Sequence, residues 1–159
     1  MTAGTQNANA YLKTKVLTAT PEELRLMLLD GGIKFARQGR DGIARKDFEA
    51  SFTGLSQSRD IVMELITTVR DEIDPELAAK VRSIYTFIYT LLVEGSFEKD
   101  VAKVDKAIEL LEFERETWAM LMQKLAEERR TGQAPAEAAP TAQPAPGPDA
   151  PRRTLSVQG

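Results

Sequence analysis

The sequence predicts an all-α fold: an antiparallel up-and-down four-helix bundle with an N-terminal docking segment and a disordered C-terminal tail. Apolar residues recur at three- and four-residue spacings, and helix-start signals surround Pro21 and Pro75. No β-hairpin signature or sustained period-two run appears. Six of the eight prolines follow Gln133, in a stretch too poor in apolar residues to fold. We therefore expect a docking segment over 1–20, a helical bundle over 21–130 and a disordered tail over 131–159.

Composition narrows the classes of function. The chain has 159 residues, a net charge of −3, and neither cysteine nor histidine. These absences exclude disulfides, thiolate metal sites, Ser-His-Asp triads and His-ligated di-iron centres. No phosphate-binding loop, dinucleotide-binding glycine motif or EF-hand loop appears. We expect no enzyme: no catalytic residues, no cofactor, no metal, and no binding of nucleic acid.

Two segments bear on localisation. Residues Met1 to Ala10 are small and polar, without the charged start and apolar stretch of a signal peptide. The longest nearly apolar run, Ile84 to Val93, is too short to span a bilayer. We expect a soluble, cytoplasmic protein without stable membrane insertion.

The first predicted helix runs from Pro21 to about Gln38. Thr20 is a natural N-cap, and Glu23 completes a capping box. Gly31 and Gly32 each disfavour a helix interior by about 1 kcal/mol relative to alanine. They indicate either close approach of a neighbouring backbone or a local kink.

The second predicted helix runs from about Asp47 to Val69. Gly39 and Gly42 are expected to loosen the chain before it begins. Phe48 and Phe52 stand at the start of its apolar stripe, so we expect both to face the core.

The third and fourth predicted helices complete the bundle. The third runs from Pro75, with Asp74 as its N-cap, to about Glu94, where Gly95 is expected to end it. The fourth runs from about Lys99 to Arg129. The short links favour antiparallel neighbours.

Two arginines, Arg59 and Arg115, interrupt the seven-residue apolar repeats of the second and fourth helices. Each stands where an aliphatic residue is expected. We expect their side chains to reach the edge of the bundle or to pair with a carboxylate.

The third helix has more apolar surface than one bundle seam uses. From Ile84 to Val93, apolar side chains point in almost every direction around a helix. Neighbouring helices and the N-terminal segment would cover this surface, or it would form a groove for a partner segment; both can hold. Tyr11, Val16 and Leu17 cannot be buried locally, so the N-terminal segment is a candidate removable cover without a strong helix of its own.

Four features of these regions occur together in a fixed order. They are Val16-Leu17-Thr18-Ala19-Thr20-Pro21-Glu22-Glu23-Leu24 after Tyr11, Met27-Leu28-Leu29-Asp30-Gly31, Ile84-Tyr85-Thr86-Phe87-Ile88, and Trp118. In these features the chain resembles a known family, the flagellin-specific chaperones called FliS. The resemblance extends over roughly Tyr11 to Leu125.

The resemblance implies a bundle that binds the disordered C-terminal segment of flagellin, prevents premature polymerisation and helps deliver flagellin to the flagellar type III export gate. We expect a monomer when free. The alternative is a structural helical-bundle protein that self-associates through its apolar third helix. The candidate client-binding or cover residues are Tyr11, Val16, Leu17, Met27, Leu28, Ile84, Tyr85, Ile88 and Leu92.

Overall fold

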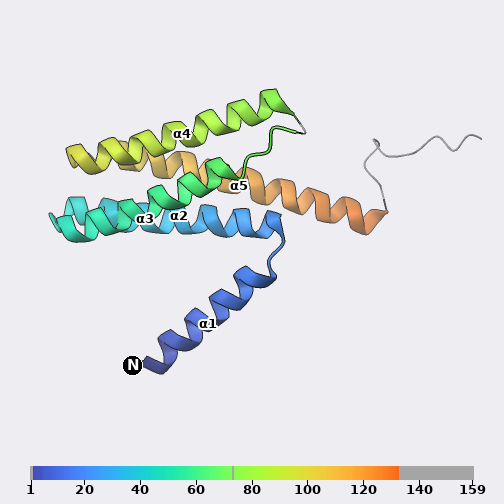
Figure 1. Cartoon of the computed structure of the whole chain (residues 1–159), viewed down its shortest axis with the longest axis horizontal. Helices are drawn as coiled ribbons and strands as arrows, with labels where there is room; N and C mark the ends of the chain where they lie inside the picture. Colours follow the sequence, from blue (N-terminus) through green and yellow to red (C-terminus); the bar gives the residue numbers. More distant parts are fainter. Residues whose placement is uncertain (1, 73, 133–159) are drawn as a thin grey trace, which may run out of the picture. The chain divides into compact units, whose positions relative to one another are not determined.

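The computed structural model of the protein describes residues 2–72 and 74–132. Within these residues the chain is all-α, as predicted, and contains no strand. The helices are α1 (Thr2–Thr18), α2 (Pro21–Ala44), α3 (Phe48–Thr67), α4 (Pro75–Glu98) and α5 (Val101–Thr131) (Figure 1). From residue 133 onward the predicted tail lies outside the described residues. No helix in the described ranges is both long and apolar enough to cross a membrane.

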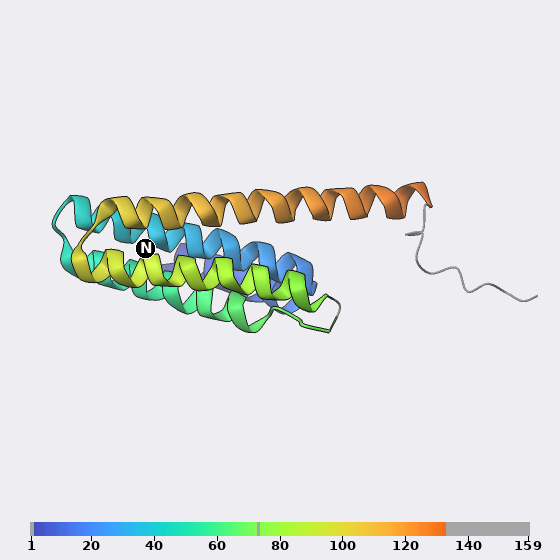
Figure 2. The ribbon, with the colours of Figure 1, turned by 90° about the horizontal axis from the view of Figure 1, so that it is seen from above.

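Helices α2, α3, α4 and α5 contribute to one hydrophobic cluster, around which they lie side by side (Figure 2). The members follow the apolar spacing of each helix, and full burial of one such side chain contributes about 1.5–3 kcal/mol. The cluster includes Leu29 and Ile33 of α2, Leu55, Val62 and Leu65 of α3, Tyr85, Ile88 and Leu92 of α4, and Val104, Ile108 and Leu111 of α5.

Two helix starts are confirmed. The Glu23 amide donates to Thr20 Oγ1 at 3.2 Å, and the Thr20 amide donates to Glu23 Oε2 at 3.0 Å, which completes the capping box. The Leu77 amide donates to Asp74 Oδ1 at 3.1 Å, so Asp74 caps α4. Each cap satisfies a backbone donor that the helix itself leaves unpaired.

The prediction that Gly39 and Gly42 loosen the chain is wrong, because α2 continues through both to Ala44. A Cβ on Gly39 would lie 2.5 Å from Leu55 Cγ, and one on Gly42 would lie 2.5 Å from the Ser51 amide nitrogen. On α3, a Cβ on Gly54 would lie 2.6 Å from the Gly39 nitrogen. The packing of two helix backbones thus outweighs the low helix propensity of glycine.

The end of α4 also differs from the prediction. The helix passes Gly95 and continues to Glu98, where Lys99 ends it in the left-handed conformation with φ 53°. A Cβ on Gly95 would lie 2.7 Å from Val104 Cγ2, so this glycine admits α5 rather than ending α4. The next helix begins where Asp100 Oδ1 accepts from the Ala102 amide at 2.9 Å.

The two phenylalanines at the start of α3 do not face the core, which corrects a further expectation. Phe48 is 46% exposed and Phe52 is 63% exposed. Lys99 Nζ lies 4.7 Å from the Phe48 ring centroid, a cation–π distance. The glycine contacts hold α3 against α2 on a different face of this helix.

The expected pairing of a seam arginine with a carboxylate is confirmed for Arg115, whose Nε donates to Asp30 Oδ1 at 2.8 Å. Arg59 is half-buried, and its Nη2 donates to Ser56 Oγ at 3.0 Å. Each guanidinium therefore has a polar partner.

The N-terminal segment was expected to lack a strong helix, and this expectation is wrong. Residues Thr2–Thr18 form α1. The described side chains of α1 are exposed, including the apolar ones. Their docking onto the other helices therefore stays a prediction.

Candidate functional site

Helix α4 presents apolar side chains on two faces. Tyr85, Ile88 and Leu92 are buried in the core. On another face, Ile84 is 36% exposed and Phe87 is 52% exposed. Leu77, seven residues before Ile84, is exposed on the same side of the helix. The neighbouring helices thus cover only part of α4, and the exposed part offers apolar surface for association rather than for chemistry.

The predicted site residues fall into three groups. Tyr85, Ile88 and Leu92 belong to the core, so these side chains of α4 pack it against the other helices. Met27 and Leu28 of α2 are half-buried, and Leu28 packs against the core. The exposed group consists of Ile84, Tyr11, Val16 and Leu17.

Helix α5 adds exposed apolar residues that were not among the predicted site residues. Phe113 and Met120, seven residues apart and hence on one face, are both exposed. The sequence indicates these residues by their seven-residue spacing on a face of α5 that does not belong to the core. Leu77 and Ile84 of α4 have the same spacing. The sequence pattern places large apolar residues, but only packing tells which face meets another helix.

A polar cluster lies among the aromatic residues of α4 and α5. The Arg25 guanidinium carbon lies 5.1 Å from the Trp118 ring centroid and 5.8 Å from that of Tyr85. Trp118 Nε1 donates to the Glu22 carbonyl at 2.9 Å, which ties α5 to the first turn of α2. Burial raises the pKa of the Glu114 carboxyl above its ordinary value, against the opposing effect of the Arg25 charge.

Exposed ion pairs join α2 to α5. Arg40 Nε donates to Asp105 Oδ1 at 2.8 Å, and this hydrogen bond raises the pKa of Arg40. Arg37 pairs with Glu112, and Arg115 with Asp30. Solvent weakens each such pair, so each contributes little to the stability of the fold.

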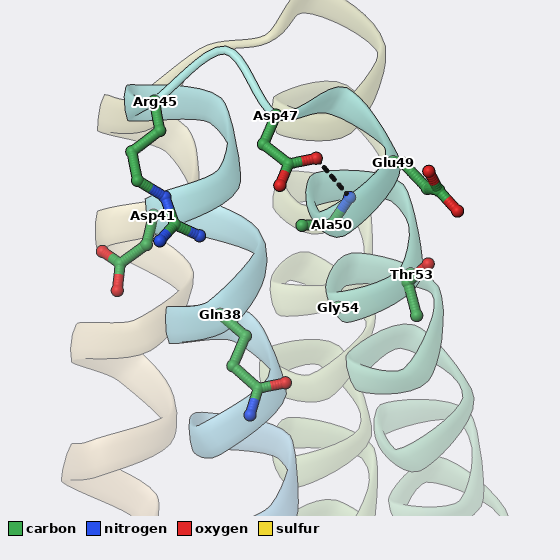
Figure 3. A pocket seen from close by; sticks show the side chains of 8 residues that line it. All are labelled: Gln38, Asp41, Arg45, Asp47, Glu49, Ala50, Thr53 and Gly54. Atoms are coloured by element: carbon green, nitrogen blue, oxygen red, sulfur yellow. Dashed lines mark hydrogen bonds between the residues drawn. The ribbon is translucent and has the colours of Figure 1, made fainter.

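A polar hollow lies where α2 passes into α3 (Figure 3). Asp47 caps the N-terminus of α3, because the Ala50 amide donates to its Oδ1 at 3.1 Å (Figure 3). Residues 2–72 and 74–132 hold no group of three or more carboxylates arranged to bind a metal ion. The hollow is lined by Gln38, Asp41, Arg45, Asp47, Glu49, Ala50, Thr53 and Gly54.

Comparison with known proteins identifies the family. The family model described as "Flagellar protein FliS" matches residues 4–125. The flagellar secretion chaperone FliS of Bacillus subtilis (strain 168) is 31% identical over 120 residues, which cover 76% of this chain and 89% of that protein. The protein of the same name from Campylobacter jejuni subsp. jejuni serotype O:6 is 26% identical over 110 residues, 69% of this chain and 86% of the relative. The chain therefore belongs to the FliS family of flagellar secretion chaperones.

Proposed function

We propose that the chain acts in the cytoplasm as an export chaperone that binds the disordered C-terminal segment of flagellin and prevents its premature polymerisation. It then helps to deliver flagellin to the gate of the flagellar type III export apparatus. Membership of a chaperone family, rather than an enzyme family, supports a function without catalysis. The binding step rests on the exposed apolar face of α4, because a partner must cover such surface.

The scaffold for this binding is an antiparallel up-and-down bundle of α2, α3, α4 and α5. Two ion pairs support the opposite directions of α2 and α5: Arg40 pairs with Asp105, and Asp30 pairs with Arg115. Residue numbers thus rise along α5 as they fall along α2. The short links between consecutive helices support the same arrangement for the others.

The flagellin segment lies along the α4 face formed by Leu77, Ile84 and Phe87. Tyr85 and Ile88 are buried on another side of α4, where they fix the helix to the core. A disordered segment that folds on its partner commonly buries about 1,000–3,000 Å² and loses about 2–5 kcal/mol to ordering. An extended apolar surface on a rigid core meets that requirement, because the core does not have to be ordered as well.

Helix α1 is a removable cover for the apolar surface before flagellin binds. Tyr11, Val16 and Leu17 are exposed apolar residues, and burying each of them would contribute about 1.5–3 kcal/mol. The entropy lost in ordering the segment opposes this gain, so the net free energy of docking α1 is about a few kcal/mol. A flagellin segment that buries a larger apolar area can displace α1 when it docks this weakly.

The binding face is tested by titrating a labelled flagellin C-terminal segment from the same organism against Phe87→Ser and the matched variant Phe52→Ser. Both side chains are more than half exposed, at 52% and 63%, but Phe52 belongs to α3. Removing Phe87 should weaken binding by roughly tenfold or more, as for a residue central to an interface. Removing Phe52 should change the affinity less than twofold. Equal losses in both variants would contradict the assignment to α4.

Measuring the molecular mass of the protein in solution at increasing concentration distinguishes the chaperone from the self-associating structural protein. A chaperone that is monomeric when free keeps the same mass as its concentration rises. A structural protein that self-associates through α4 gains mass without any flagellin, and Phe87→Ser suppresses that gain.

The cover is tested by deleting residues 1–17. The shortened protein should bind more of an apolar dye and self-associate, while its helical content per residue stays nearly constant. Adding the flagellin segment should suppress both effects. Unaltered dye binding and mass, or loss of the fold, would each rule out a displaceable cover.

A further inference from the structure

A second exposed apolar surface lies on α3, away from the face that packs Gly54 against α2. Phe48, Phe52 and Met63 are 46%, 63% and 44% exposed. Together with the half-buried Arg59 they stand four, seven and four residues apart, so their side chains lie on one face of the helix. We call these four residues the α3 stripe. Large apolar residues gathered in this way indicate a surface that a partner covers.

Two cations belong to this surface without a carboxylate partner. Arg59 Nη2 donates to Ser56 Oγ at 3.0 Å, and Lys99 Nζ lies 4.7 Å from the Phe48 ring centroid. Neither cation forms an ion pair among the residues that the structure describes, whereas Arg115 pairs with a carboxylate. A hydroxyl and an aromatic ring do not neutralise a positive charge. The α3 stripe is therefore complementary to a partner that carries negative charge.

The α3 stripe is separate from the face of α4 on which the flagellin segment is placed. Phe87 stands seven residues before Glu94, whose Oε2 accepts from Lys103 Nζ of α5 at 2.8 Å. Because residues seven apart lie on the same side of a helix, the side of α4 that bears Phe87 borders α5. A partner on the α3 stripe thus leaves the Phe87 side of α4 free.

We propose that the α3 stripe binds an amphipathic helix of a second partner protein, with aspartate or glutamate at the edges of its apolar face. The stripe runs along α3 for about 22 Å, the length of about four helical turns. A helix lying along it presents apolar residues at three- and four-residue spacings to Phe48, Phe52 and Met63, and its carboxylates pair with Arg59 and Lys99. This inference goes beyond the proposed function, because the chain binds this partner and flagellin at the same time.

Helix α1 of this chain does not have the chemistry of such a partner. Residues Thr2–Thr18 include Lys13 and Lys15 and contain no aspartate or glutamate. Like charges would oppose the docking of α1 beside Arg59 and Lys99. The cover of the client face and the occupant of the α3 stripe are therefore different segments.

The chemistry of the partner is tested with two labelled synthetic helices about four turns long. Both have the same apolar face, but one has glutamate beside that face and the other has lysine. Each is titrated with the full-length chain, alone and then saturated with the flagellin C-terminal segment. The glutamate peptide should bind about tenfold or more tightly than the lysine peptide, and flagellin should change its affinity less than about twofold.

Equal affinities of the two peptides, or displacement of the glutamate peptide by flagellin, would overturn the proposal. If the chain binds no flagellin, the proposed function fails, while the titration of the free chain still decides whether the α3 stripe selects an acidic helix.

Two pairs of variants place the peptide on the α3 stripe. Phe52→Ser should weaken binding of the glutamate peptide roughly tenfold or more, while the matched variant Phe87→Ser should change it less than about twofold. Arg59→Glu should reverse the preference between the peptides. Lys99→Glu changes an exposed side chain and should shift the preference in the same direction, which keeps the test valid if Arg59→Glu folds poorly. Equal effects at Phe52 and Phe87, or an unchanged preference in both charge variants, would contradict the assignment.

The natural occupant is identified by placing a photo-crosslinking amino acid at position 52 of the chain in cells of the same organism and sequencing the crosslinked segment. We expect a segment of a protein other than flagellin, with apolar residues at three- and four-residue spacings and flanking aspartate or glutamate. Crosslinking to flagellin, to a second copy of this chain or to lipid would contradict the proposal, and so would the absence of any crosslink.

Discussion

The two ends of α2 pack in opposite ways. Toward its C-terminus, Gly39 and Gly42 bring the backbones of α2 and α3 together, and a Cβ on either would lie 2.5 Å from an atom of α3. Near its N-terminus, the Arg25 guanidinium lies within cation–π distance of the Trp118 and Tyr85 rings, and two of its nitrogens are buried. The first region, the glycine contact, brings main-chain atoms of both helices together. The second region, the Arg25 cluster, consists of side chains.

This difference indicates which of the two regions can adjust locally to a changed side chain. Main-chain atoms in a helix are held by its hydrogen bonds, so single atoms at the glycine contact cannot shift to make room for a larger side chain. Side chains at the Arg25 cluster can change rotamer within the same backbone. We therefore expect the free energy of unfolding to depend more on the glycine contact than on the surroundings of Arg25.

The largest expected effect is on Gly54, the α3 residue of the glycine contact. A Cβ there would lie 2.6 Å from the Gly39 nitrogen and 2.8 Å from the Phe35 carbonyl oxygen, neither of which can yield easily. Gly54→Ala should therefore lower the free energy of unfolding by roughly 1–3 kcal/mol or more, measured by denaturant titration.

Gly32→Ala is the matched control for Gly54→Ala. Both glycines are buried within helices, but a Cβ on Gly32 would find its nearest atom, Ile61 Cγ2, at an ordinary 3.5 Å. Alanine should therefore fit and stabilise the protein by about 0.4–1 kcal/mol. Similar changes in both variants would remove the distinction between close backbone contact and ordinary helical glycine.

A smaller effect is expected at the start of α2, beside the Arg25 cluster. Thr20→Ala removes the side chain that accepts from the Glu23 amide and should lower the free energy of unfolding by about 0.5–2 kcal/mol. Thr53→Ala, an exposed threonine inside α3, is the control and should stay within about 0.5 kcal/mol. If denaturant titration gives the same midpoint for Thr20→Ala and wild type, this end does not depend on its cap.

The smallest effect is a pH dependence from Glu114. Burial raises the pKa of its carboxyl above 4.5, so the folded state binds its proton more tightly than the unfolded state does. By linkage, the stability contributed by Glu114 is fully present below pH 4.5 and is lost as pH rises through the raised pKa. Glu114→Gln should abolish this loss, so its stability relative to wild type should increase as pH rises through that window.

Denaturant titrations at a series of pH values check this prediction. Glu116→Gln, which changes an exposed carboxylate of the same helix, is the control. A stability difference between Glu114→Gln and wild type that does not vary with pH would show that Glu114 is not desolvated in the folded protein.

Local chemistry was sufficient to predict the helical class and the helix starts. Thr20, Glu23 and Asp74 act on amides within three residues of themselves, so their caps could be predicted without the rest of the fold. The apolar spacing likewise predicted core residues such as Leu55 and Val62.

Tertiary packing decided what local chemistry left open. Gly39 and Gly95 resemble breaks in the sequence, yet both lie within helices because a neighbouring helix comes too close for a Cβ. Residues distant along the chain also decide which apolar face of α4 is covered. They likewise decide that Arg25 lies close to aromatic rings of two other helices. A sequence pattern carries the identity of a side chain and its spacing, but the distance to a neighbouring helix exists only once the helices have packed.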